Sequence, residues 1–249
     1  HVVGMGIGTM AGSMLGGTLA GFSYRNYYLV YLIPFIAMVG VQAFLVETPP
    51  TKTEKASDMK LNKMVYLISF ASFAHTLFIN AYSTNIGIYI AENISNNPGL
   101  AGMVTSVNAA FALGTGMIFS KISAVLKNFT LPLSILTAAV GYGLVLTVHG
   151  MAGVLIVSAL CGVSLSCFMA TGSYLLSISV EQEAVAKASG LFSIIGGIGG
   201  LIAPIFMGNA ARIVLGENTA VNQFVIAFFG MLSFGVIAAV IMMKKKENK

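Results

Sequence analysis

The sequence predicts an all-α, polytopic membrane protein built as a helical bundle. Of its 249 residues, 57% are hydrophobic and only 8% are charged, whereas about a quarter of the residues in a soluble domain are charged. Long apolar runs, each near the ~20 residues that cross the hydrocarbon core of a bilayer, alternate with polar loops. These runs are continuous and lack the alternation over ~10 residues that strands of a membrane barrel show. Because spanning backbone must satisfy its own hydrogen bonds, we expect helices.

Eight apolar runs are long enough to be spans. They cover residues 2–21, 27–46, 64–91, 99–119, 129–149, 151–178, 186–208 and 221–243. No Asp, Glu, Lys or Arg lies deep inside any of them. Most connecting loops are short, so neighbouring helices are expected to be antiparallel. Pro34 and Pro204 fall inside spans, where proline kinks a helix.

The elements follow one another in a recognisable order. Two spans come first, and tyrosines at 24, 27, 28 and 31 cluster at the boundary between them, where amphipathic rings prefer the membrane interface. The longest polar stretch, residues 47–63, mixes charges and carries two prolines. Six spans and a lysine-rich tail, residues 244–249, complete the chain. The order is therefore two helices, a charged loop and six helices.

The basic residues divide unequally between alternate loops. Eleven lysines fall on one side: Lys52, Lys55, Lys60, Lys63, Lys121, Lys127, Lys187, Lys244, Lys245, Lys246 and Lys249. Only Arg25 and Arg212 fall on the other. The positive-inside rule then places the 47–63 loop and the C-terminus in the cytoplasm. We expect the basic surface to meet anionic lipid headgroups and not nucleic acid.

The first span carries a regular glycine motif. Gly8, Gly12 and Gly16 recur every four residues and so lie on one helix face. Their missing side chains let another helix approach closely. On spacing alone, this pattern also fits ordinary packing of small residues between any two helices.

Several local motifs resemble those of the major facilitator superfamily. Residues 8–17, GTMAGSMLGG, resemble its antiporter signature: Gly8, Gly12, Gly16 and Gly17 match, and Ser13 replaces the usual proline. Residues 23–35 and the exit LVETPP at 45–50 resemble the family's sixth helix. Residues 114–128 resemble a degraded copy of its loop between helices eight and nine, with Ser120 where Asp is typical. Residues 190–208 resemble its glycine-rich eleventh helix.

The resemblance implies helices five to twelve of a twelve-helix transporter. Residues 1–46 would be the last two helices of the N-terminal bundle, 47–63 the cytoplasmic central loop, 64–243 the C-terminal six-helix bundle and 244–249 a cytoplasmic tail. The chain begins at His1 with no signal-peptide n-region, so we expect a C-terminal fragment whose N-terminal helices are missing. The two bundles would rock about a central site, exposing it to each side of the membrane in turn.

A polar stripe runs along the third span. It consists of Ser69, Ser72, Thr76, Asn80, Ser83 and Gly87, which fall within an arc of about 80°. Such a stripe is not expected to face lipid, and the resemblance makes this span the pathway-lining seventh helix. Asn80 is the foremost candidate because its amide both donates and accepts hydrogen bonds. Hydrogen bonding between helices is the alternative.

Two other spans carry smaller polar sets. The fourth contains Thr105, Asn108 and Thr115, and the sixth contains Ser164, Cys167, Thr171 and Tyr174. The candidate pathway residues are therefore Ser72, Thr76, Asn80, Ser83, Asn108, Thr171 and Tyr174. His75 is the only histidine well inside a span. It titrates near neutrality and is a candidate proton relay, although a neutral histidine bonded to a neighbouring helix is the simpler interpretation.

No enzyme constellation is visible, and we expect neither a cofactor nor a metal. Cys161 and Cys167 are expected to pack as small apolar residues. The antiporter-like motif favours proton-coupled efflux of small apolar or amphipathic compounds from a cell (plasma or inner) membrane, with any proton-carrying carboxylate in the missing helices. Uptake or exchange of a small polar metabolite is one alternative. A non-transporting scaffold or sensor derived from a transporter half is another.

Overall fold

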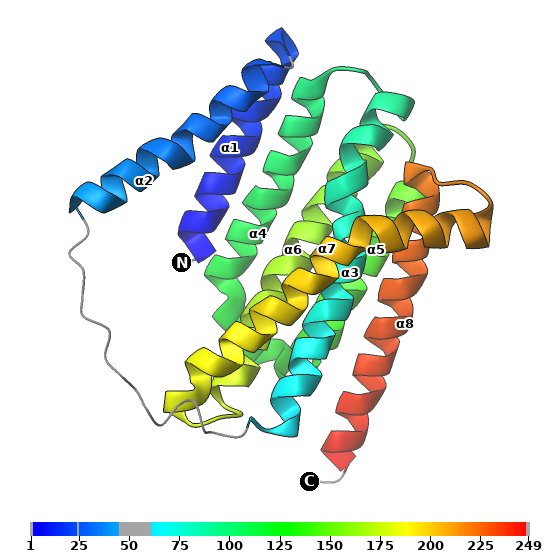
Figure 1. Cartoon of the computed structure of the whole chain (residues 1–249). Coiled ribbons are helices and arrows are strands. Elements are labelled where there is room, and N and C mark those ends of the chain that lie inside the picture. The colour runs from blue at the N-terminus through cyan, green and yellow to red at the C-terminus, as the bar shows by residue number, and fades with distance from the viewer. Residues whose placement is uncertain (1, 24, 45–60, 248–249) are drawn as a thin grey trace.

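The computed structural model describes residues 2–23, 25–44 and 61–247 (Figure 1). The predicted all-α class is confirmed, and these residues contain no strand. One α-helix corresponds to each predicted span: α1 (Val2–Phe22), α2 (Leu32–Phe44), α3 (Lys63–Asn93), α4 (Pro98–Leu126), α5 (Thr130–Thr147), α6 (Met151–Ser177), α7 (Val185–Leu215) and α8 (Ala220–Glu247). Residues 45–60 lie outside the described residues, and they include most of the expected central loop, 47–63, and the last two residues of the expected second span.

Five stretches of the described residues are long and apolar enough to cross a membrane. They are Lys63–Asn93, Pro98–Thr147, Met151–Ser177, Gln182–Leu215 and Ala220–Met243, and the second runs through both α4 and α5. Tyr28–Phe44 is a shorter apolar helix. Many large apolar side chains on α2 and α7 are exposed, which suits a lipid environment. The chain is therefore an integral membrane protein.

The second span differs from the uniform helix that the sequence predicts. It begins as a 3-10 helix, η1 (Asn26–Tyr31), and becomes α-helical only at Leu32. Pro34 consequently sits in the first turn of α2, where its missing N–H and fixed φ are tolerated, and it does not kink the middle of a helix. Pro204 does lie inside α7, as predicted.

Local signals explain several helix ends. Asn62 precedes α3 and its side chain accepts a hydrogen bond from the backbone N–H of Met64. Asn97 does the same for Gly99 at the start of α4, where Pro98 is the first helical residue. Both are standard N-terminal caps. At the C-terminal end of α7, Gly216 adopts a φ of 85°, the left-handed conformation that commonly terminates helices.

Consecutive helices run in opposite directions along the bundle (Figure 1). Helix α5 packs between α6 and α8, and α3 packs chiefly on α7. Helix α1 lies beside α4, and α2 leaves the end of α1 at an angle (Figure 1). We call the end where α4, α6 and α8 terminate the lysine end, since Lys63, Lys121, Lys127 and Lys187 lie there.

Glycines allow close approaches between α1 and α4 and between α3 and α7. On α1, Gly17 meets Gly102 of α4, where an added Cβ would lie 2.8 Å from the opposing Cα. On α7, an added Cβ at Gly199 would overlap the carbonyl oxygen of Phe73, and one at Gly196 would overlap Ser72 Oγ. Small residues thus bring backbones together, as they do between membrane helices generally.

The hydroxyl of a buried tyrosine reaches the backbone of α3. The hydroxyl of Tyr142, on α5, accepts a hydrogen bond from the backbone N–H of Tyr82 at 3.0 Å. The same oxygen lies 3.1 Å from the carbonyl oxygen of Phe78 and 3.2 Å from that of Ile79. The Tyr142 ring, fully buried, packs 5.7 Å from the ring of Phe224 on α8. This residue therefore joins α3, α5 and α8.

Candidate substrate pocket

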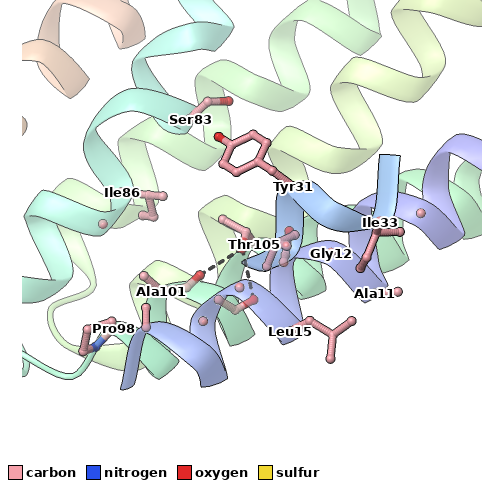
Figure 2. A pocket seen from close by; sticks show the side chains of 18 of the residues that line it. Ala11, Gly12, Leu15, Tyr31, Ile33, Ser83, Ile86, Pro98, Ala101 and Thr105 are labelled. Carbon is pink, nitrogen blue, oxygen red and sulfur yellow. Dashed lines mark hydrogen bonds between the residues drawn. The ribbon is translucent and has the colours of Figure 1, made fainter. Parts of the chain in front are cut away.

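A large cavity lies between the helix pair α1–α2 and the helix pair α3–α4. It has a volume of about 870 Å³ and is lined by α1, the η1–α2 segment, the last third of α3 and the first turns of α4 (Figure 2). That volume lies within the ~300–1,000 Å³ of typical small-molecule sites. The cavity is therefore large enough for a drug-sized compound.

Small and apolar residues form most of the cavity wall. One side is the glycine face of α1, where Gly8, Gly12, Gly16 and Gly17 all contribute. At Gly8 and Gly12 an added Cβ would meet no atom within 4 Å, so this stretch of the motif borders open space within the described residues. Gly16 and Gly17 are buried, and Gly17 makes the contact with α4.

Few polar groups reach the cavity, and none of the residues that line it is charged. Tyr31 and Ser83 extend from η1 and α3 into the same region (Figure 2). Thr105 also lines it, but its hydroxyl donates within α4 to the carbonyl oxygens of Ala101 and Gly102, 3.0 Å away in each case. Besides Thr105, the cavity wall therefore carries hydroxyl groups from Ser13, Tyr31 and Ser83.

The polar stripe of α3 divides between two environments. Ser72 and Thr76 face the glycines of α7, because an added Cβ at Gly196 would meet both hydroxyl oxygens. Asn80 lies next to Gly200, and its amide donates to the carbonyl oxygen of Thr76 at 3.0 Å. Ser83 and Gly87, by contrast, line the large cavity.

The other candidates lie away from this cavity. Asn108 of α4 donates from Nδ2 to the carbonyl oxygen of Ser158 on α6 at 2.9 Å. Thr171 is buried and donates to the carbonyl oxygen of Cys167 at 2.7 Å. Tyr174 is 54% exposed and, like Thr171, lines a second cavity at the lysine end. The structure thus groups only Ser83, among the predicted pathway residues, with the α1 glycines.

His75, on α3, is completely buried against α6. Its ring stacks on Phe168 with centroids 4.0 Å apart, and its Nε2 lies 3.2 Å from Ser164 Oγ. Its Nδ1 has no hydrogen-bond partner among the described residues. The Oγ atoms of Ser69 and Ser72 are also buried without a partner there. The histidine is held as a packed ring and lines neither the large cavity nor the cavity at the lysine end.

Sequence reasoning missed several residues that hold the helices around the site together. Gly102 makes the contact with α1, and the short motif Gly99–Leu100–Ala101–Gly102 was its only local signal. Tyr142 gave no signal beyond being a tyrosine in a span. Asn85 donates to Gln223 Oε1 at 2.8 Å, a bond between α3 and α8 that no single-helix pattern predicts.

Nothing in the described part of the chain forms a metal site. No group of three or more His, Cys, Asp or Glu side chains comes together there. Cys161 and Cys167 are buried free thiols.

Comparison with known families settles the class of protein. Residues 68–249 match the family model of the Major Facilitator Superfamily. The chain belongs to this family. A comparison with curated proteins finds no match. Members of this superfamily are secondary transporters and not enzymes, which agrees with the helical, membrane-spanning architecture.

Proposed function

We propose that this superfamily member exports small apolar or amphipathic compounds in exchange for protons. The observation that carries the proposal is the uncharged cavity of about 870 Å³ with its glycine-rich wall. A site without Lys, Arg, Asp or Glu offers no partner for a charged metabolite, whose burial without a counter-charge is costly. Apolar walls with a few hydroxyls suit a compound that is mostly apolar.

The location of the cavity supports a role in alternating access. Its walls come both from α1 and α2, which we assign to the N-terminal bundle, and from α3 and α4, which we assign to the C-terminal bundle. Substrates of such transporters bind where two repeats meet. A cavity between the two assigned bundles would change shape whenever they rock against each other.

Proton coupling requires a group that gains and loses a proton. No acidic residue lines the cavity, so we place the proton-carrying carboxylate in helices upstream of α1. We further propose that the lysine end faces the cytoplasm, on the strength of the positive-inside rule. Transport would then run from the lysine end to the opposite side.

A cavity-filling substitution tests this proposal. Gly12→Phe places a ring in the cavity without a backbone clash, because an added Cβ at Gly12 meets no atom within 4 Å. Gly114→Phe is the matched control: it also lies in open space, on α4, but away from the cavity. We expect Gly12→Phe to slow proton-driven transport of an uncharged fluorescent dye such as Nile red in vesicles containing the full-length protein, and Gly114→Phe to leave it unchanged.

The same vesicles separate the alternatives. Competition by many apolar compounds supports efflux, whereas saturation by one hydroxylated or carboxylated metabolite would replace it with metabolite exchange. Absence of any transport by the full-length protein, with the fold intact, would favour the scaffold or sensor reading. Equal slowing of transport by Gly12→Phe and Gly114→Phe would show that the cavity is not part of the transport pathway.

A further inference from the structure

A second cavity opens at the lysine end of the bundle. It has a volume of about 440 Å³ and lies where α4 and α6 end and α3 and α5 begin, with α8 closing one side. The large cavity lies at the opposite ends of α3 and α4. The second cavity is therefore a separate site within the six helices α3–α8.

The wall of this cavity is amphipathic. Leu131, Leu175, Ile178 and Met242 supply apolar surface, and Ile178 is 62% exposed, so the cavity continues onto the outer surface of the bundle. Polar groups come from Ser123, Lys127, Asn128, Thr171 and Tyr174. Among the described residues, no acidic side chain lines it. Such a combination of one cation, several hydrogen-bond donors and an apolar flank fits an anionic amphiphile.

Lys127 is held in an unusual backbone conformation. Its φ is 48°, and it is the only non-glycine residue with a positive φ in the described part of the chain. Glycine is the usual residue at such a position. The Lys127 N–H donates to the carbonyl oxygen of Ser123, and its own carbonyl accepts from Thr130 Oγ1 at 2.7 Å. The backbone is thus fixed from both sides, which is how an unfavourable conformation persists, often at functional sites.

The side chain of Lys127 has no competing partner. Its ammonium makes no hydrogen bond or ion pair with any described residue. Around it, the lysine end carries four lysines against Glu181 and Glu183 within residues 61–243. The opposite end of the described chain balances Arg25 and Arg212 against Glu92 and Glu217. An excess of positive charge at one end attracts an anionic membrane surface.

We propose that the second cavity binds the phosphate headgroup of an anionic phospholipid. Lys127 would neutralise the phosphate as a point charge, with Asn128 and the Tyr174 hydroxyl as further hydrogen-bond donors. The acyl chains would leave the cavity across Ile178. This inference does not depend on what the transporter carries and stands if the export proposal fails.

Native mass spectrometry of the full-length protein tests the site. The detergent-purified protein is mixed with equimolar phosphatidylglycerol and phosphatidylcholine that have identical acyl chains. We expect the wild type to retain phosphatidylglycerol preferentially. Lys127→Gly should reduce that preference by about fivefold, the contribution of one lysine near an anionic surface. Lys121→Ala removes an exposed lysine from α4 that does not line the cavity and should keep the preference.

The choice of glycine guards against a folding artefact. Glycine accepts a positive φ without cost, so Lys127→Gly should melt no earlier than the wild type. Retention of the full lipid preference by Lys127→Gly would overturn the proposal, as would equal binding of both lipids by the wild type. Displacement of phosphatidylglycerol by millimolar inorganic phosphate would assign the site to a free phosphate and also overturn it.

Discussion

The contact between α1 and α4 yields a quantitative prediction for Gly102→Ala. The new Cβ would lie 2.7 Å from the carbonyl oxygen of Ser13 and 2.8 Å from the Cα of Gly17. Carbon atoms pack best at about 3.5–4.0 Å, so α1 must move away by roughly 0.7 Å or more. Both opposing atoms belong to backbone and cannot rotate aside, so the helices themselves must separate.

The size of the effect follows from the overpacking of this contact. Overpacking a close contact costs about 1–3 kcal/mol, and a backbone clash belongs in the upper part of that range. The higher helix propensity of alanine stabilises α4 whether or not α1 lies against it, so it cancels in the opening of α1. The α1–α4 contact is then weakened by about 2–3 kcal/mol, which changes an opening equilibrium by roughly 30–150-fold.

Hydrogen exchange measures this local opening directly. Amides of α1 in the detergent-purified protein should exchange faster in Gly102→Ala by that factor, while amides of α5 keep their wild-type rates. Gly114→Ala makes the same change on α4, where an added Cβ meets no atom within 4 Å, and should leave α1 unaffected. Wild-type exchange in α1 of Gly102→Ala would refute the close approach of these two helices.

Three further outcomes are expected. Tyr142→Phe removes the hydroxyl bonded to the Tyr82 N–H and should lower the free energy of unfolding by about 1–3 kcal/mol; an unchanged melting temperature would contradict that bond. The Cβ added by Gly196→Ala would overlap Ser72 Oγ and should destabilise the fold. Ser72→Ala removes that oxygen and should restore stability in the double variant; simple additivity of the two effects would rule out the contact. His75→Gln should keep proton-driven transport, since His75 borders neither cavity; selective loss of proton coupling would make it a relay.

The helices were predictable because span length and hydropathy are properties of single segments. Their ends were less so: α3 continues to Asn93 and α7 to Leu215, beyond the predicted limits of 91 and 208. Helical bonding does not stop where apolar residues stop. Arg212 lies in the last turn of α7, where a cation suits the negative end of the helix dipole.

The site was predictable only in part, because periodicity identifies a face but not what covers it. The stripe on α3 predicted one shared environment for Ser72 and Ser83, yet Ser72 meets α7 and Ser83 lines a cavity. Which part of the stripe is covered depends on Gly196 and Gly200 of α7, more than a hundred residues later in the chain. Gly102 was missed for the same reason, since its role exists only once α1 lies against it.

The glycine contact between α1 and α4 also has a mechanical consequence. Side chains that interlock must be lifted out of their holes before two helices can slide, and each such step costs packing energy. At Gly17 and Gly102 there is no side chain to lift, because two backbones meet directly. Under our proposed assignment of α1 and α4 to different bundles, this contact would let the halves of the transporter slide past each other with little loss of packing energy.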